Sequence, residues 1–281
     1  MKFGFVTCVQ LGLSCMEAIY DAGGQLALAV TLLDDKAVSK SGRVYLDQFC
    51  YQHKVPLLKS AHVNDPEVVD AIKQAGIDWL FIVGWSQIAG ASVLAAPRLG
   101  VFGMHPTLLP VGRGRAAIPW AILKDIRKTG VTLFKMDEGV DTGPIALQLE
   151  IPIDSITDAT YLYRAVEMAH VHIIHEVIPK ILCGELILRD QDNTKATVWP
   201  GRNPADGEID LAGSVFDAHR LIRAVTHPYP GAFFYQGTVK IVVWSARLAP
   251  VDESNTSANS DVRRLSFRDG VLLLDDYQIA N

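Results

Sequence analysis

The sequence has no excess of basic charge and no long apolar run. Among 281 residues, 26 Lys plus Arg stand against 31 Asp plus Glu, for a net charge of -5. Because a protein that binds nucleic acid needs a basic face to neutralise phosphates, this balance disfavours a nucleic-acid partner. The longest apolar stretches, 26–33 and 79–83, are far shorter than the ~20 residues that span a bilayer. The sequence therefore predicts no membrane partner.

Cysteine is scarce, and a secretion signal is missing. The chain has 4 cysteines, none in the paired C-x-x-C spacing of zinc or redox motifs: Cys8, Cys15, Cys50 and Cys183. We interpret them as buried thiols of a reducing compartment. The N-terminus, MKFGFVT, resembles a strand and lacks an apolar segment with a cleavage site. These features predict a cytoplasmic protein.

Two common ligand motifs are also missing. A dinucleotide-binding sheet would carry G-x-G-x-x-G in its first strand-to-helix turn, whereas residues 7–12 read TCVQLG. His170, His172 and His175 share one predicted helix but lack the i, i+4 spacing of a metal pair. We therefore predict no dinucleotide cofactor and no metal.

What is present indicates a packed α/β protein. With 49% hydrophobic and 20% charged residues, the chain can bury a core. Short apolar runs alternate with helical patterns over the first half, which is typical of a Rossmann-like, mostly parallel sheet. Predicted strands cover 2–7, 26–32, 79–83, 101–104 and 130–135, and predicted helices cover 11–22, 42–53 and 65–75.

A second, smaller unit is predicted after a long helix over 158–182. We expect an N-terminal catalytic domain at 1–183, a linker at 184–206 and a small C-terminal β-rich, OB-like domain at 207–281. The C-terminal domain is predicted to hold a helix near 215–225 and strands over 231–235, 239–247, 262–267 and 271–277, with a hairpin loop at 252–261.

The segment 100–145 carries the polar residues best placed for chemistry. His105 follows the strand 101–104, at the strand end where open α/β sheets place their active sites. Asp141 follows the strand 131–135, which parallel alternation would place beside it, so the two side chains could meet. A carboxylate beside an imidazole suits acid–base work near neutral pH. The alternatives are a structural histidine and an aspartate that only forms the turn before Gly143.

Four motifs in this segment, taken in order, resemble the folate-dependent formyltransferases. They are H-P-T-L-L-P at 105–110, R-G-R-A-x-x-P at 113–119, T-G-V-T at 129–132 and M-x-x-x-x-D-T-G-x-I at 136–145. Further along, the segments 200–202, 206–210 and 223–233 resemble 4-amino-arabinose formyltransferases and related sugar enzymes. The resemblance covers most of the chain and implies the formyltransferase fold.

The resemblance implies a catalytic site. In that family a formyl group passes from 10-formyltetrahydrofolate to a primary amine, through an Asn-x-His pair and a distant Asp. His105 and Asp141 match the His and the Asp, whereas Gly103 stands where the family has Asn. An amide aimed at an oxyanion contributes about 2.7 to 4 kcal/mol, so its loss should slow transfer by about 100- to 1000-fold unless another donor replaces it. Water, Gln87, Ser86, Thr107 and Thr132 are the candidates.

Binding residues also follow from the resemblance. The folate slot would lie between the loop at 84–88 and the loop at 137–141, with slot residues Trp85, Ser86, Gln87, Ile88, Val140 and Asp141. Core packing is the alternative for the apolar members of this set. For the acceptor, Arg113 and Arg115 could hold a diphosphate or brace their loop, and Thr107 and Tyr229 could line the site.

The acceptor separates three hypotheses. The sugar-like C-terminal segments favour formylation of a nucleotide-linked amino sugar. Methionyl-tRNA formylation would favour a basic C-terminal domain, yet residues 201–281 carry 8 Lys plus Arg against 10 Asp plus Glu. The third hypothesis, motivated by Gly103, is a catalytically altered protein that binds folate or a sugar nucleotide. The C-terminal domain could support acceptor binding or a homodimer.

Overall fold

A computed structural model describes residues 1–36, 42–250 and 263–280 of the chain. The hairpin loop predicted at 252–261 lies outside these residues. The chain divides into two compact units. The first holds 1–114, 129–151 and 165–198, and the second holds 115–128, 152–164 and 199–281. Each is described by itself below.

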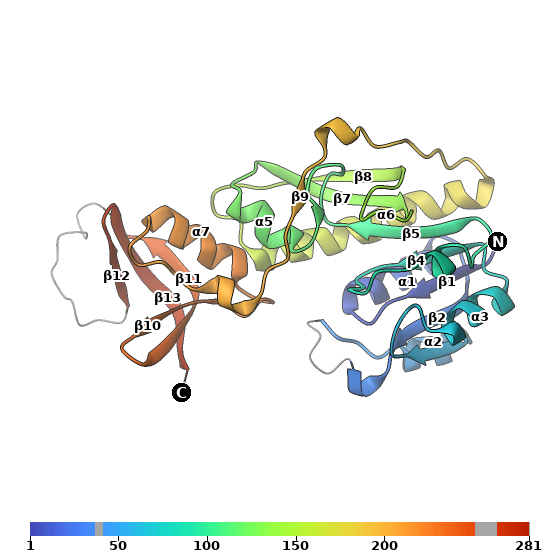
Figure 1. The fold of residues 1–281 in the computed structure, drawn as a ribbon, viewed down its shortest axis with the longest axis horizontal. Helices are drawn as coiled ribbons and strands as arrows, with labels where there is room; N and C mark the ends of the chain where they lie inside the picture. The colour runs from blue at the N-terminus through green and yellow to red at the C-terminus, as the bar shows by residue number, and fades with distance from the viewer. Residues whose placement is uncertain (37–41, 251–262, 281) are drawn as a thin grey trace. The chain divides into compact units, whose positions relative to one another are not determined.

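The first unit is built on a seven-stranded sheet in the order β3-β2-β1-β4-β5-β7-β8 (Figure 1). The strands from β3 to β5 run parallel, and β7 runs antiparallel to β5. Their bounds are β1 Phe3–Val6, β2 Leu26–Leu32, β3 Leu57–Ser60, β4 Trp79–Ile82, β5 Gly100–His105, β7 Lys128–Lys135 and β8 Ile145–Pro152. The predicted fold class, a Rossmann-like and mostly parallel sheet, is confirmed.

Helices α1 to α4 connect the parallel strands, and α6 follows β8. They are α1 Gln10–Asp21, α2 Asp47–His53, α3 Pro66–Ala75, α4 Ala91–Leu94 and α6 Ala159–Cys183, with the short turn η1 Asp34–Lys36; α6 belongs to this unit from Ala165 on. α1 starts close against β1, because a Cβ at Gly12 would lie 1.9 Å from Thr7 Oγ1. α3 begins with Pro66 and ends at Gly76 in the left-handed conformation, as its sequence predicts.

Three details differ from the sequence predictions. The strand predicted at 130–135 is antiparallel to its neighbour, with His105 opposite Thr132. The helix predicted at 42–53 begins only at Asp47, because Arg43 forms a bridge with Val9 instead. Strands β3 and β8 were not predicted; β3 is short, whereas β8 shows alternating apolar residues that could have indicated a strand.

The segment predicted to be a linker has local structure of its own. It contains η2 Asn193–Lys195, β9 Val198–Trp199 and η3 Pro204–Gly207. β9 forms a two-stranded ladder with β6, Arg113–Gly114. The segment is therefore hydrogen-bonded to the loop that follows His105. The domain boundaries at 183 and 206 remain predictions.

Apolar side chains pack the parallel half of the first unit. Phe3, Phe5, Phe81 and Phe102 are fully buried, and their rings lie 5.5 to 5.9 Å apart between centroids. Burying a Phe side chain contributes roughly 1.5–3 kcal/mol, so each of these rings stabilises the parallel half of the sheet. The cluster fixes the strands whose carboxyl ends carry the site.

The second unit is a four-stranded antiparallel sheet covered by helices. Strand order is β10-β11-β13-β12, with bounds Ala232–Gln236, Val239–Leu248, Gly270–Ala280 and Arg264–Phe267 in that order. Helix α7, Val215–Val225, packs on this sheet and on α5, Ala117–Leu123. Ser214 caps α7 by accepting a hydrogen bond from the Phe216 backbone N–H. The predicted C-terminal β-rich domain and its helix are confirmed.

No helix among the described residues combines the length and the apolar character needed to cross a membrane.

Candidate active site

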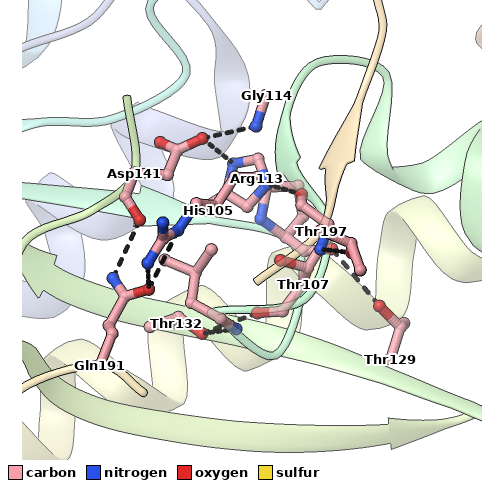
Figure 2. A network of polar contacts seen from close by, with 12 residues as sticks. His105, Thr107, Arg113, Gly114, Thr129, Thr132, Asp141, Gln191 and Thr197 are labelled. Atoms are coloured by element: carbon pink, nitrogen blue, oxygen red, sulfur yellow. Dashed lines mark hydrogen bonds and ion pairs between the residues drawn. The ribbon is translucent and has the colours of Figure 1, made fainter. Parts of the chain in front are cut away.

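His105 ends β5 as a buried imidazole, with 7% of the residue exposed. Its Nε2 lies 2.7 Å from the carbonyl oxygen of Gly112, and its Nδ1 lies 3.6 Å from Asp141 Oδ2 (Figure 2). A carbonyl can only accept, so Nε2 carries a proton. Nδ1 is then the ring atom that can gain or lose a proton, and it does so facing a carboxylate.

Asp141 is brought to His105 by the loop between β7 and β8. The antiparallel direction of β7 makes the parallel reasoning behind this prediction wrong, yet the two side chains do meet. The Gly114 backbone N–H donates to Asp141 Oδ2 at 2.8 Å, which fixes the carboxylate. Asp141 has φ of 55°, a left-handed conformation that Asp adopts more readily than most residues with a Cβ but that still costs free energy. The carboxylate is therefore held in place by the Gly114 N–H and by the contacts of its turn.

Arg113 braces its loop instead of facing solvent. The residue is 8% exposed, and its guanidinium donates to Gln191 Oε1 at 2.7 and 3.2 Å and to Asn193 Oδ1 at 2.7 Å. Because the guanidinium is bonded to side chains of the protein itself, these contacts support the prediction that Arg113 braces its loop over the prediction that it holds a diphosphate. Gln191 was not predicted, because a single polar residue in an aperiodic segment gives no sequence signal.

A buried hydroxyl network supports the loop after His105 (Figure 2). Thr132 Oγ1 donates to the Thr107 carbonyl oxygen at 2.7 Å and accepts from the Leu109 N–H at 3.1 Å and from Gln148 Nε2 at 2.9 Å. Thr132 is thus fully used and is not free to bind an oxyanion. Thr107 is also buried, and its own hydroxyl has no partner among the described residues.

Gly103 lies on β5, and a side chain at this position would point at Phe134 and Met136. A Cβ at this position would lie 3.1 Å from Phe134 Cζ and 3.2 Å from Met136 Sδ. These distances are shorter than ordinary van der Waals contact, so either neighbour would have to move for any side chain. Met136 and Phe134 occupy the space into which a residue at 103 would extend.

The candidate donor slot has exposed apolar side chains at its edges. Ile88 is 74% and Val140 55% exposed, which excludes core packing as the role of either side chain here. Trp85 packs partly against the core, and its Nε1 donates to Gln87 Oε1 at 3.2 Å. Ser86 lies beside them on the same loop, exposed and engaged in polar contact.

Gln87 holds the slot loop to the loop after β3. Its Oε1 accepts from the Val63 N–H at 2.8 Å, and its Nε2 donates to the Ala61 carbonyl oxygen at 3.0 Å. Gln87 Oε1 and one Nε2 hydrogen are used in these contacts, which hold the side chain in its loop.

Two predicted acceptor residues belong to the second unit. Arg115 is exposed, and its backbone N–H donates to the Trp199 carbonyl oxygen at 3.1 Å. Tyr229 lies in the loop between α7 and β10, where burial raises the pKa of its hydroxyl far above the usual range. Their roles toward an acceptor stay predictions.

His170 is buried below the site on α6. Its Nδ1 lies 2.7 Å from the Val166 carbonyl oxygen, and burial lowers the pKa of the ring to about 4, with His105 as a further lowering charge. It is neutral at pH 7 and packs in the core, as predicted. Among the described residues no three His, Cys, Asp or Glu side chains gather in a way that could hold a metal ion.

Comparison with protein families identifies the class. Residues 16–178 match the formyl transferase family, and residues 202–280 match the formyl transferase C-terminal domain. The chain belongs to the formyl transferase family. The predicted enzyme class, a transferase of formyl groups, is confirmed.

Solved structures share this fold over the full chain. WlaRD, a sugar 3N-formyltransferase crystallised with dTDP and 5-N-formyl-THF, has a TM-score of 0.69 and 18% identity, covering 100% of this chain and 98% of that one. An N-formyltransferase from Helicobacter canadensis, in complex with folinic acid and dTDP-3-aminofucose, has a TM-score of 0.69 and 17% identity, covering 100% of both. Methionyl-tRNA formyltransferase from Clostridium thermocellum has a TM-score of 0.62 and 19% identity, covering 100% of this chain and 99% of that one. At these identities the likeness shows the fold alone.

Proposed function

We propose that this protein moves a formyl group from 10-formyltetrahydrofolate to the primary amine of a nucleotide-linked amino sugar. The observation that carries the proposal is the pair of His105 Nδ1 and Asp141 Oδ2, 3.6 Å apart at the carboxyl end of β5. The family supplies the reaction class, and two full-length structural neighbours that are sugar formyltransferases support the acceptor class.

Within this proposal His105 and Asp141 divide the proton transfer. Bound 10-formyltetrahydrofolate would supply the formyl carbon that the acceptor amine attacks, with loss of the bond to the folate nitrogen. His105 keeps the proton on Nε2 because Gly112 accepts it, and Nδ1 faces the reaction. A proton on Nδ1 can support the developing oxyanion, and Asp141 stabilises the charged ring and can receive the amine proton, directly or through water. The same proton is then delivered to the folate nitrogen as its bond to the formyl carbon breaks.

The slot residues fit a folate. A pterin is flat and largely apolar on its faces, and the exposed Ile88 and Val140 side chains would lose contact with water by packing against it. The loop that carries Trp85 is held by Gln87 in a fixed position before any ligand binds.

Oxyanion support is the step in which this chain differs from its family pattern. Thr132 is committed to structural hydrogen bonds, and Gly103 has only its backbone. The buried Thr107 hydroxyl has no partner among the described residues, so Thr107 stays a candidate donor beside Ser86, Gln87 and bound water, and a proton on His105 Nδ1 is a further one. Without any such replacement, the loss of a side-chain amide would slow the reaction by about 100- to 1000-fold.

The acceptor is tested by offering the candidate acceptors in separate reactions. The purified protein is incubated with 10-formyltetrahydrofolate and either dTDP- and UDP-linked 3-amino and 4-amino sugars or methionyl-tRNA, and products are read by mass spectrometry. We expect one formyl group on an amino sugar and none on methionyl-tRNA, because the C-terminal residues 201–281 carry more acidic than basic side chains. Formylation of methionyl-tRNA alone would overturn the acceptor assignment.

A protein that only binds these ligands is the second candidate, and Gly103 is the observation that favours it. Such a protein would bind both ligands and give no product in single-turnover reactions at high enzyme concentration. Product that forms in a single turnover and disappears in His105→Ala would exclude it.

A further inference from the structure

Asp141 needs an external support, because its own backbone does not favour the position it takes. Its φ of 55° lies in the left-handed region, where a side chain with a Cβ crowds the backbone. The following glycine, Gly143, packs tightly as well, since a Cβ there would lie 1.8 Å from the Lys135 carbonyl oxygen. A turn of this kind keeps its shape only if surrounding contacts determine it.

Gln191 supplies such contacts with one amide group. Its Nε2 donates to the Asp141 carbonyl oxygen at 2.9 Å (Figure 2). The same Nε2 donates to the Gly143 carbonyl oxygen at 2.7 Å, so one NH2 group holds the turn on both sides of Thr142. Its Oε1 accepts from the buried Arg113 guanidinium. Only this orientation of the amide pairs each donor with an acceptor; the flipped amide would oppose donors to donors.

The same segment also holds the other partner of His105. Thr197 Oγ1 accepts from the Gly112 N–H at 2.9 Å, and the Thr197 carbonyl oxygen accepts from the Arg113 N–H at 2.9 Å. Gly112 in turn accepts from His105 Nε2. Gln191 and Thr197, at the two ends of this segment, therefore fix the contacts of both ring nitrogens. They lie between the two regions that match the family, 16–178 and 202–280.

We propose that Gln191 is a positioning residue for formyl transfer, which sets the Asp141 carboxylate against His105 Nδ1 through the Arg113–Gln191–Asp141 chain of hydrogen bonds. This inference rests on the proposed function for its effect on rate. Its structural content, the coupling of Gln191 to His105, is independent of which reaction the site performs.

The test is Gln191→Glu in the full chain. A glutamate keeps the acceptor for Arg113 but places an oxygen against the two carbonyl oxygens, which releases the turn. We expect kcat to fall by about 10- to 100-fold, because small misplacements of reacting groups cost this much, while KM for both substrates changes little. Lys195→Gln, an exposed change on the same segment, is the matched control and should leave kcat unchanged.

A spectroscopic measurement makes the test independent of activity. Nitrogen NMR of ring-labelled histidine follows Nδ1 of His105, assigned with His105→Gln. We expect the Nδ1 signal of Gln191→Glu to shift toward that of Asp141→Asn, and the signal of Lys195→Gln to match the wild type. Gln191→Met, which lacks both amide atoms, replaces the glutamate variant if that one does not fold.

The outcomes separate the two proposals. An unchanged His105 signal in folded Gln191→Glu overturns the positioning role, whatever the reaction. If the His105 signal shifts in Gln191→Glu but the wild-type protein forms no product, the positioning role stands and the proposed function is refuted. A fall in stability with kcat unchanged would show that Gln191 is structural only, and would also overturn the proposal.

Discussion

The two halves of the seven-stranded sheet are stabilised in different ways. From β3 to β4 the strands are parallel and packed by apolar side chains, with the Phe3 and Phe81 rings among them. Beyond β5 the sheet continues with β7, which is antiparallel to β5, and this half buries polar groups, among them Thr132 and His105. The apolar half tolerates little change of volume, and the polar half tolerates little loss of a partner. The comparison teaches that the apolar half serves stability, whereas the polar half serves both stability and chemistry.

Removing an apolar ring should affect stability and leave chemistry intact. Phe3 is fully buried at the start of β1, so Phe3→Ala should lower the free energy of unfolding by about 3–5 kcal/mol through a cavity. Urea unfolding measures this change. For the folded fraction we expect kcat within about 3-fold of the wild type; a larger fall in kcat would mean that the two halves are not separable.

Replacing either member of the His105–Asp141 pair should lower kcat and leave the fold intact. His105→Ala and Asp141→Asn should each lower kcat by at least about 100-fold, or about 2.7 kcal/mol, since each removes a group that acts in proton transfer. Steady-state kinetics give this number, and circular dichroism checks the fold. Turnover near the wild-type value in either variant would remove that residue from the mechanism.

The polar half should respond to the loss of one hydroxyl. Thr132→Val keeps the shape of the side chain but leaves the Leu109 N–H and the Thr107 carbonyl oxygen without their partner. We expect a loss of about 2–3 kcal/mol in the free energy of unfolding and also a lower kcat, because the loop after His105 loosens. A stability loss with kcat fully retained would argue against the network as a support of the site.

Acid should destabilise the protein through His170. Its pKa is lowered to about 4 in the folded state against about 6.5 unfolded, so the unfolded state binds the extra proton between these values. Stability is therefore kept above pH 6.5 and lost as the pH falls toward 4, by about 2 kcal/mol between pH 7 and pH 5. His170→Leu should flatten this slope in urea unfolding. His172→Leu, at an exposed position on the same helix, should not.

The smallest expected effect concerns Gly103. Gly103→Ala should cost about 1 kcal/mol, since the new methyl group presses on Phe134 and Met136. Adding Met136→Ala should relieve part of this cost in a double-mutant cycle. In the same way Gly103→Asn should raise kcat only in combination with Met136→Ala; a gain from Gly103→Asn alone would show that Met136 yields easily.

The sequence predicted the apolar half better than the polar half, for a physical reason. In the apolar half, strand 26–32 follows from local periodicity and matches β2. In the second unit, helix 215–225 follows from local periodicity in the same way and matches α7. The meeting of His105 and Asp141 was predicted, but through a parallel pairing that is wrong. Gln191 could not be predicted, because its partners Arg113 and Asp141 lie 78 and 50 residues away and hydrogen bonds at such separations leave no periodic pattern.

Isothermal titration of the wild-type protein tests the central claim most directly. The protein is titrated with 5-formyltetrahydrofolate, a stable mimic of the donor, and separately with dTDP- and UDP-linked 3-amino and 4-amino sugars. The account predicts that the folate binds and that at least one amino-sugar nucleotide binds. Binding of a sugar nucleotide without any binding of the folate would contradict it, and would mean that the donor site was lost together with the amide at position 103.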